Sequence, residues 1–246
     1  MFISFILLFS QIVSATPMTS VIPKGVQDFP CKQTIPWEQH PTMDIGENCK
    51  YEAANAALPP ASDHRVIYFG DSLTEGWTNR IVGITNDDVL NRGIGGQTTG
   101  QMLVRFRADV LNLKPKIVHL LVGTNDIAGN KGPTSIARIQ DAIMSMCEQA
   151  EAHGIRVILA SLLPAKTIPW NDSIKNSAAS VRTLNQWLRN YAARNGHVYA
   201  DYESVLSDGQ DGFIRGLSID GIHPTAAGYT AMIPVARDAI TRANIE

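Results

Sequence analysis

The stretch RVIYFGDSLTEGW, from Arg65 to Trp77, indicates the fold of this chain. Its first half is a near-continuous apolar run, and its second half is polar and reads as the start of a helical turn. Continuous apolar runs are typical of strands that are covered on both faces, as in parallel sheets. Four further runs of this kind follow: VLNRG (89–93), KIVHLLVG (116–123), IRVILAS (155–161) and HVYAD (197–201).

Helical patterns alternate with these runs. In four segments, apolar residues three or four positions apart share one face: Met102, Phe106 and Val110; Ile136, Ile139, Ile143, Met146 and Ala150; Val181, Leu184, Leu188 and Tyr191; Tyr229, Met232 and Val235. Pro234 should kink or split the last helix, which opens at Thr225. The alternation predicts an α/β fold of three α/β/α layers, with a mostly parallel sheet of about five strands, over residues 65–246.

Composition places the chain among ordinary globular proteins. Of its 246 residues, 44% are hydrophobic and 18% are charged, which sets aside a disordered or fibrous protein. The formal net charge is −2, and no long run of one charge sign occurs. Proteins that bind nucleic acid or anionic membranes carry a basic footprint instead, so we expect neither as a partner.

The first residues, MFISFILLFSQIVSATP, are typical of a secretory signal peptide. The apolar core Phe2–Phe9 is too short to span a bilayer, and Val13–Ser14–Ala15 offers the small residues that a signal peptidase accepts. No Lys or Arg precedes this core, so a buried N-terminal segment or a loose membrane anchor is the alternative. We expect residues 1–15 to be removed and the mature protein to be secreted or periplasmic, without stable membrane insertion.

Residues 16–64 read as an irregular N-terminal arm. Seven of the 13 prolines fall within the first 60 residues, and this density disfavours regular structure. A short helix is expected around Glu47–Ala57. Cys31 and Cys49 both lie in this arm, where an oxidising compartment would let them form a disulfide. Cys147 lies on an apolar helix face and is expected to be a buried, unreactive thiol.

The loops that follow the predicted strands carry most of the polar motifs. In open parallel sheets, ligands bind beyond the carboxyl ends of the strands, so these loops are where a site is expected. They bring together a serine, backbone amides freed by glycine, an asparagine, and a histidine three residues after an aspartate. The segments are GDSLTEGW (70–77), GIGGQTT (93–99), GTNDI (123–127), LLPAKTIPW (162–170) and, near the C-terminus, DGIHPTAAGY (220–229).

Acyl transfer requires residues of these types. Serine is a weak nucleophile until a base takes its proton, and His223 is the candidate base for Ser72. Asp220 could accept a hydrogen bond from the other ring nitrogen and so fix the tautomer of the histidine. The developing oxyanion needs donors placed in advance, and the candidates are the N–H of Ser72, a glycine N–H and the side-chain amide of Asn125.

The glycine-rich stretch NRGIGGQTTG (91–100) is similar in composition to a phosphate-binding loop. The dinucleotide fingerprint needs glycines at its first, third and sixth positions, and a count from Gly93 finds Thr98 at the sixth. No lysine stands where a P-loop would need one. The glycines therefore fit a different task, which is to bring a backbone N–H close to an acyl oxygen with no Cβ in the way.

Four of these blocks resemble those of the SGNH, or GDSL-type, serine hydrolase family. GDSLTEGW, NRGIGGQTT, GTND and DGIHP occur in the family's order. The resemblance implies that Ser72 is the nucleophile, that Asp220 and His223 complete the triad, and that Gly96 and Asn125 are oxyanion donors. It further implies a flavodoxin-like α/β/α fold and ester hydrolysis that uses no metal and no organic cofactor.

Other residues near the motifs have weaker roles in this interpretation. Asp71, Ile127 and Trp170 lie in or directly after the motifs at the catalytic edge, so they are candidates to line the substrate pocket, with simple packing as the alternative. His119 lies inside an apolar run and is expected to be a core histidine rather than a ligand. No spacing of His, Cys, Asp or Glu amounts to a metal site.

The sequence thus predicts a secreted serine esterase that works through an acyl-enzyme. Short-chain acyl esters, acetyl esters in particular, are the expected substrates, either as small molecules or on polysaccharides. The alternatives on the same scaffold are a lysophospholipase, a thioesterase or an acyltransferase. A non-catalytic glycan-binding protein is disfavoured, because its expected signature is a lost nucleophile, histidine or oxyanion donor, and all three are present.

Overall fold

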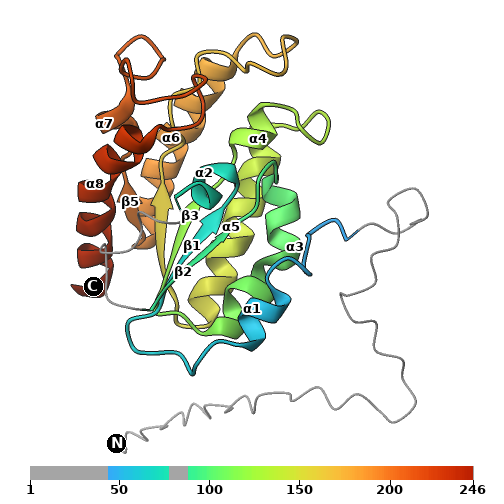
Figure 1. Cartoon of the computed structure of the whole chain (residues 1–246), viewed down its shortest axis with the longest axis vertical. Coiled ribbons are helices and arrows are strands. Elements are labelled where there is room, and N and C mark those ends of the chain that lie inside the picture. The colour runs from blue at the N-terminus through green and yellow to red at the C-terminus, as the bar shows by residue number, and fades with distance from the viewer. Residues whose placement is uncertain (1–43, 78–87, 246) are drawn as a thin grey trace, which may run out of the picture. The chain divides into compact units, whose positions relative to one another are not determined.

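The structure is a computed structural model that describes residues 44–77 and 88–245. Within these residues, five strands form one sheet in the order β2-β1-β3-β4-β5, and every pairing is parallel (Figure 1). This confirms the predicted α/β fold. The strands are β1 (Val66–Gly70), β2 (Val89–Gly93), β3 (Ile117–Leu121), β4 (Arg156–Ala160) and β5 (Val198–Ala200).

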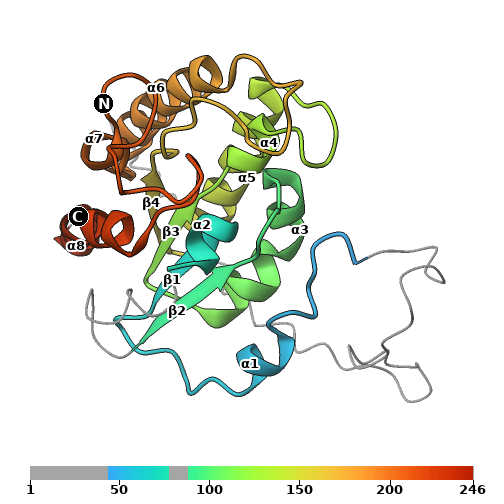
Figure 2. The same ribbon diagram turned by 45° about the horizontal axis from the view of Figure 1, so that its top comes forward.

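Helices cover both faces of the sheet. The helices α3, α5 and α6 lie on one face, as right-handed crossovers between parallel strands require, and α8, which follows the last strand, lies on the other (Figure 2). The long helices are α3 (Thr99–Asp109), α5 (Ile136–Ala152), α6 (Ser177–Asn195) and α8 (Ala226–Ile245). The short helices are α1 (Glu52–Ala56), α2 (Ser72–Glu75), α4 (Thr124–Ile127) and α7 (Glu203–Leu206), together with the 3-10 turn η2 (Leu111–Leu113).

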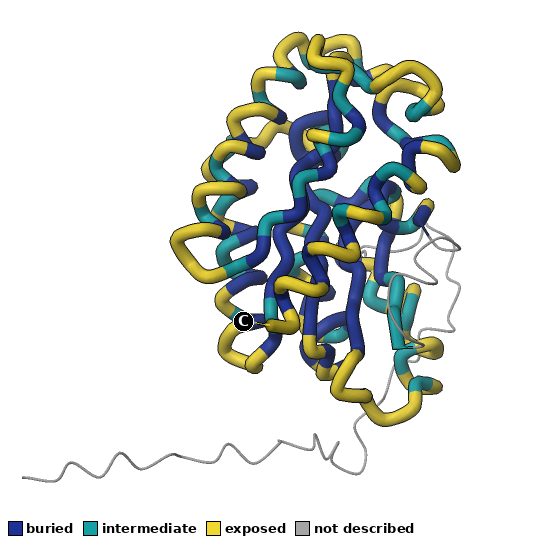
Figure 3. The backbone as a smooth tube through the Cα atoms, turned by 90° about the vertical axis from the view of Figure 1, so that its left-hand side faces the viewer, coloured by how far each residue is buried: buried dark blue, intermediate teal, exposed yellow. Residues whose placement is uncertain are grey.

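The central strands are buried on both faces, as their unbroken apolar sequences predict (Figure 3). Successive side chains of β1 point to opposite faces. Tyr68 therefore stacks on His119 of β3, with ring centroids 4.5 Å apart, while Phe69 meets Phe106 of α3 edge-to-face at 5.4 Å. His119 is fully buried with Nε2 2.7 Å from the hydroxyl of Tyr202, and burial lowers its pKa to about 3. The neutral ring is a core residue, as expected.

Of the two expected effects of Pro234, a kink or a split, the split does not occur. The helix α8 runs from Ala226 to Ile245 with Pro234 inside it. Proline deprives the carbonyl of Thr230, four residues earlier, of its helical hydrogen bond. Both residues are exposed, so water can satisfy that carbonyl and the helix continues.

The described part of the arm begins at residue 44 and belongs to the same compact unit as the sheet. It forms α1, which lies within the segment where a short helix was expected. The predicted signal peptide and Cys31 lie outside the described residues, so both the cleavage and the pairing of Cys31 with Cys49 stay predictions. None of the helices in residues 44–77 and 88–245 is long and apolar enough to cross a membrane.

Candidate active site

The turn after β1 places Ser72 at the start of a helix. The carboxylate of Asp71 caps α2 by accepting a hydrogen bond from the N–H of Leu73 at 2.9 Å. Ser72 is the first residue of α2, so its own N–H is among those that have no partner within the helix. The turn needs glycine at position 70, because a Cβ there would lie 2.3 Å from the hydroxyl of Thr74 and 2.4 Å from the carbonyl of Leu121.

A histidine and an aspartate from the loop before α8 meet this serine. The Oγ of Ser72 lies 3.0 Å from Nε2 of His223, and Nδ1 of His223 lies 2.7 Å from Oδ2 of Asp220. The other oxygen of Asp220 accepts the backbone N–H groups of Ile222 at 2.9 Å and His223 at 2.7 Å. The structure therefore joins the three predicted triad residues into one hydrogen-bonded chain.

The carboxyl group of Asp220 is held in its ionised form. Partial burial pushes its pKa upward, but hydrogen bonds from the backbone and side chain of His223 and from the backbone of Ile222 outweigh that effect. The net result is a pKa below the ordinary value. An ionised carboxylate is an acceptor only, so Nδ1 of His223 is the donor, and Nε2 is left free to accept the proton of Ser72.

The glycine-rich loop after β2 places two glycine amides in different environments. The N–H of Gly95 donates to the carboxylate of Glu75 at 2.9 Å. The N–H of Gly96 has no hydrogen-bond partner among the described residues, and Gly96 has a φ of +75° that favours glycine. The sequence alone could not separate these two amides. The structure leaves the one at Gly96 available to a substrate oxygen.

Asn125 lies at the start of α4, directly after β3, and its side chain is 4% exposed. Its Nδ2 donates to Oδ2 of Asp71 and to the carbonyl of Gln97, both at 3.1 Å. Its Oδ1 accepts from Nδ2 of Asn130. These contacts fix the direction of the amide. An oxyanion would share one of the Nδ2 hydrogens, and such catalytic hydrogen bonds often align fully only once substrate is bound.

Asp71 lies beneath the site and does not line a pocket wall, in contrast to the expectation from the sequence. It is 1% exposed, and its two oxygens face the N–H of Leu73 and the amide of Asn125. Burial raises the pKa of Asp71 to about 7, against the lowering effects of the Leu73 hydrogen bond and of nearby His223. Asp71 therefore supports both the helix that carries Ser72 and the amide of Asn125.

The raised pKa of Asp71 predicts a pH-dependent stability. Between the ordinary pKa of 3.8 and the folded value of about 7, the folded chain keeps a proton that the unfolded chain has released. Stability contributed by this group therefore falls as pH rises through that window. We expect the unfolding free energy of the wild type minus that of Asp71→Asn to fall across this range in urea titrations. A difference that stays constant with pH would contradict the assignment.

The two remaining pocket candidates lie in different environments. Ile127 is 8% exposed and lines a cavity of about 240 Å³ with Ile136, Ile139 and Ile174, and the lining of this cavity does not include the triad. Trp170 is 45% exposed, and its ring centroid lies 6.1 Å from that of His223. Trp170 therefore lies at the rim of the site, whereas Ile127 faces a neighbouring apolar cavity.

Asn130 was missed by the sequence analysis. Its Nδ2 donates to Asn125, and its Oδ1 accepts from Nε1 of Trp170 at 2.8 Å. It thus links the rim tryptophan to the candidate oxyanion amide. The sequence did contain a clue to this contact. Asn130 follows Asn125 by five residues in GTNDIAGN, and a short helix followed by a turn can bring two side chains at that spacing together.

The described residues hold neither a metal cluster nor a reactive thiol. Within residues 44–77 and 88–245, no three His, Cys, Asp or Glu side chains lie close enough to hold a metal ion. Cys147 is buried, and burial raises the pKa of its thiol, so it is an unreactive core residue as expected.

Comparison with known proteins gives the family. Residues 68–231 match the model of the GDSL-like lipase/acylhydrolase family, a span that includes all four sequence blocks. This chain belongs to that family. A GDSL-like acylhydrolase is a carboxylic ester hydrolase, and this class of reaction needs an activated nucleophile and oxyanion donors.

Two curated relatives of this GDSL-like chain were found. The lipoprotein YqeF of Bacillus subtilis is 37% identical over an alignment 117 residues long, and the match covers 40% of this chain and 48% of YqeF. The match therefore spans about half the length of that relative. The esterase TesA of Pseudomonas aeruginosa is 25% identical over 188 residues, which are 74% of this chain and 86% of TesA.

Solved structures agree with the GDSL-like fold. A protein of Bacteroides fragilis assigned as an acylhydrolase is 39% identical, with a TM-score of 0.77, and the match covers 81% of this chain and 98% of that one. The acetylxylan esterase Axe2 of Geobacillus stearothermophilus is 16% identical with a TM-score of 0.62, over 74% of this chain and 96% of that one. The second likeness concerns the fold alone.

Proposed function

We propose that this chain is a serine esterase that hydrolyses short-chain carboxylic esters through an acyl-enzyme. The observation that carries the proposal is the hydrogen-bonded chain from Oγ of Ser72 through His223 to Asp220. The three residues follow strands at the carboxyl edge of the parallel sheet, where open α/β sheets bind their ligands, and the loops that carry Gly96 and Asn125 leave the same edge.

In the first half of the proposed reaction, Oγ of Ser72 attacks the ester carbonyl carbon while Nε2 of His223 takes the hydroxyl proton. The carbonyl π electrons move to oxygen, and the oxyanion accepts hydrogen bonds from the N–H groups of Ser72 and Gly96 and from Asn125. The tetrahedral intermediate then collapses. The bond to the alkoxy oxygen breaks, and the alcohol leaves with the proton held by His223.

In the second half, water replaces the alcohol. Nε2 of His223 takes a proton from the water as its oxygen attacks the acyl-serine carbonyl carbon. Collapse breaks the bond to Oγ, which regains its proton from His223, and the carboxylic acid leaves. Asp220 keeps its negative charge throughout and stabilises the imidazolium that forms in each half.

A short acyl group suits the exposure of the site. The side chains of His223 and Asp220 are 34% and 36% exposed, so the catalytic groups lie near the surface. A long acyl chain gains free energy in proportion to the apolar area that it buries, and the apolar cavity at Ile127 is separate from the triad. An acetyl group needs no such cover.

The position of Trp170 indicates that the alcohol part of the ester is a sugar. A half-exposed indole beside the catalytic histidine offers an apolar face and a fixed orientation, because its N–H is held by Asn130. Pyranose rings present C–H groups on one face that pack against such an aromatic surface, while their hydroxyl groups stay in water. We therefore propose acetylated small sugars or polysaccharides as the substrate class.

Hydrolysis of p-nitrophenyl esters from acetyl to palmitoyl tests the proposed function. We expect a rate that falls steeply beyond butyryl, since among the described residues the cavity at Ile127 includes no triad residue in its lining. A preference for long chains would keep the serine chemistry but overturn the substrate class in favour of a lysophospholipase. Turnover only of acyl-thioesters, or only with an added alcohol acceptor, would replace the esterase by a thioesterase or an acyltransferase.

Two variants at Trp170 test whether its indole ring binds the sugar part of the substrate. Trp170→Phe keeps an aromatic ring but loses the N–H that Asn130 accepts, and Trp170→Ala loses both. We expect Trp170→Ala to raise KM for an acetylated oligosaccharide by about fivefold, since a stacked ring contributes on the order of 1 kcal/mol, and Trp170→Phe to raise it less. Both should leave KM for p-nitrophenyl acetate unchanged. Equal losses of kcat in both variants, without a change in KM, would show that Trp170 only supports Asn130.

We also propose that the protein is exported, to the outside or the periplasm, with removal of residues 1–15. The support is the apolar N-terminal sequence, and one curated relative is a lipoprotein. The intact mass of the protein secreted by a bacterial host tests this proposal. A mass that retains Met1–Ala15 would contradict it.

A further inference from the structure

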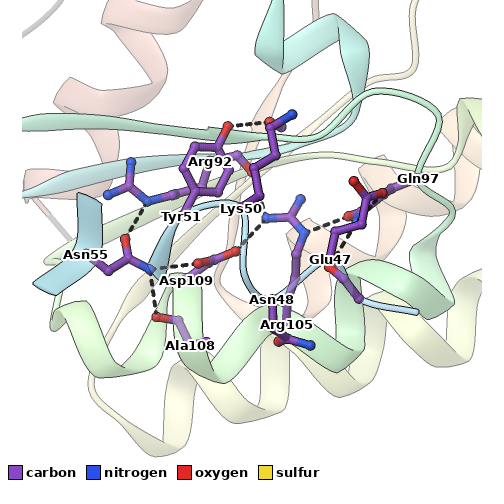
Figure 4. Close-up of polar contacts among 12 residues, drawn as sticks. Glu47, Asn48, Lys50, Tyr51, Asn55, Arg92, Gln97, Arg105, Ala108 and Asp109 are labelled. Atoms are coloured by element: carbon purple, nitrogen blue, oxygen red, sulfur yellow. Dashed lines mark hydrogen bonds and ion pairs between the residues drawn. The ribbon is translucent and has the colours of Figure 1, made fainter. Parts of the chain in front are cut away.

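The arm segment Asp44–Ala57 contacts the loop that carries the candidate oxyanion donor Gly96. This loop, Gly93–Gln97, is called the oxyanion loop below. The arm segment precedes residues 68–231, which match the family, yet it reaches the oxyanion loop at several points (Figure 4). The contacts that follow all lie within the compact unit that contains the sheet.

The first contact runs through Gln97, whose side chain is buried and forms hydrogen bonds with both of its polar atoms. Its Nε2 donates to the carbonyl of Gly46 at 3.0 Å, and its Oε1 accepts from Nε of Arg105 at 2.6 Å. The backbone carbonyl of the same residue accepts from Nδ2 of Asn125 at 3.1 Å. A single residue therefore separates the arm from the candidate oxyanion amide of Asn125.

The second and third contacts hold the other end of the oxyanion loop. The hydroxyl of Tyr51 donates to the carbonyl of Gly93. Lys50 pairs with one oxygen of Glu75, and the other oxygen accepts the N–H of Gly95 at 2.9 Å. Glu75 is also the last residue of α2, the helix that begins at Ser72, so the arm, the loop and the nucleophile turn share this carboxylate.

A buried polar network anchors the arm beneath the loop. Nδ2 of Asn55 in α1 donates to Asp109 at 2.8 Å, and its Oδ1 accepts from Nε of Arg92 at 2.8 Å (Figure 4). Arg105, which is fully buried, donates to Asp109 at 3.1 Å and to the carbonyl of Gly70 at 2.9 Å. The network thus ties the arm to the end of β1, immediately before Asp71 and Ser72.

We propose that the arm segment Asp44–Ala57 is a positioning element of the active site, which holds the oxyanion loop so that the N–H of Gly96 points at the substrate oxygen. Within residues 44–77 and 88–245 the N–H of Gly96 has no hydrogen-bond partner, so its direction depends on the residues on either side. Both neighbours are held by groups in contact with the arm: Gly95 through Glu75, and Gln97 through Gly46. The inference rests on the proposed role of Gly96 and Asn125 as oxyanion donors.

The double variant Lys50→Met/Tyr51→Phe tests this inference in the full-length protein. It removes two of the contacts and keeps the size of both side chains, while Asn55 and Gln97 stay in place. We expect kcat for p-nitrophenyl acetate to fall about tenfold, a part of the ~10²–10³ lost with one oxyanion donor, and KM to stay unchanged. Hydrogen exchange of the amides in residues 93–97 should become faster.

The control is Glu52→Gln in the same segment, because Glu52 is exposed and its side chain makes no hydrogen bond or ion pair within the described residues. It should match the wild type in both readouts. Unchanged kcat in the double variant, or a loss no larger than in the control, would overturn the inference, and so would unchanged exchange of the loop amides. Failure of the proposed function would look different: Ser72→Ala would keep its activity, whatever the loop exchange in the arm variant.

Discussion

Replacing Ser72 with alanine is expected to lower kcat for p-nitrophenyl acetate by on the order of 10⁶-fold, the size of effect that loss of the nucleophile has in serine hydrolases with a triad. Without Oγ, no acyl-enzyme forms, and only the oxyanion donors and substrate binding remain to accelerate attack by water. The fold should be unaffected, since the helix cap is the side chain of Asp71 and not that of Ser72.

Ser145→Ala is a matched control for this variant. Ser145 lies in the middle of α5, and its hydroxyl bonds only to the carbonyl of Asp141 within its own helix. It should retain wild-type kcat and KM. If Ser72→Ala kept a kcat similar to that of Ser145→Ala, Ser72 would not be the nucleophile, whatever its distance from His223.

Replacing His223 with alanine is expected to be nearly as damaging, because no other group lies in hydrogen-bond contact with Oγ of Ser72 among the described residues. The diagnostic result is that the losses of kcat in the two single variants do not multiply in the double variant. The double variant Ser72→Ala/His223→Ala should be no slower than Ser72→Ala alone, since the two side chains act as one unit. Asp220→Asn should cost about 10⁴-fold, because an amide can donate to Nδ1 and so favours the wrong tautomer.

His153→Ala serves as the control for loss of a histidine, since His153 is exposed at the end of α5. Rates for the single and double variants are compared at one pH, with folding checked by circular dichroism. Multiplicative losses from Ser72→Ala and His223→Ala would show that the two residues act independently. That result would rule out a shared proton transfer between them.

The sheet could be predicted because each of its strands is a short, continuous apolar run in the sequence. Each of the five apolar runs became a strand, since a run covered on both faces needs no longer-range information to be recognised. The four-residue helices α4 and α7 could not be predicted in this way. They are single turns that contain few apolar residues, and tertiary contacts rather than periodicity decide whether such turns are helical.

The meeting of Ser72, Asp220 and His223 was predictable from motif order and from the rule that loops gather at the carboxyl edge of a parallel sheet. The supporting residues were not. Tyr51 and Gly93 are 42 residues apart, and Gln97 and Gly46 are 51 apart, and neither contact leaves a periodic trace in the sequence. The arm therefore read as an irregular segment of no assigned role, although its side chains lie against the oxyanion loop.

Ser72 is expected to form the covalent intermediate. The most direct test is to treat the protein with an alkyl fluorophosphonate, digest it, and locate the adduct by tandem mass spectrometry. One adduct for each chain, on Ser72 alone, with activity lost in proportion to labelling, is the result that this account predicts. An adduct on a different residue, or full ester hydrolysis by a protein that is labelled on Ser72, would contradict it.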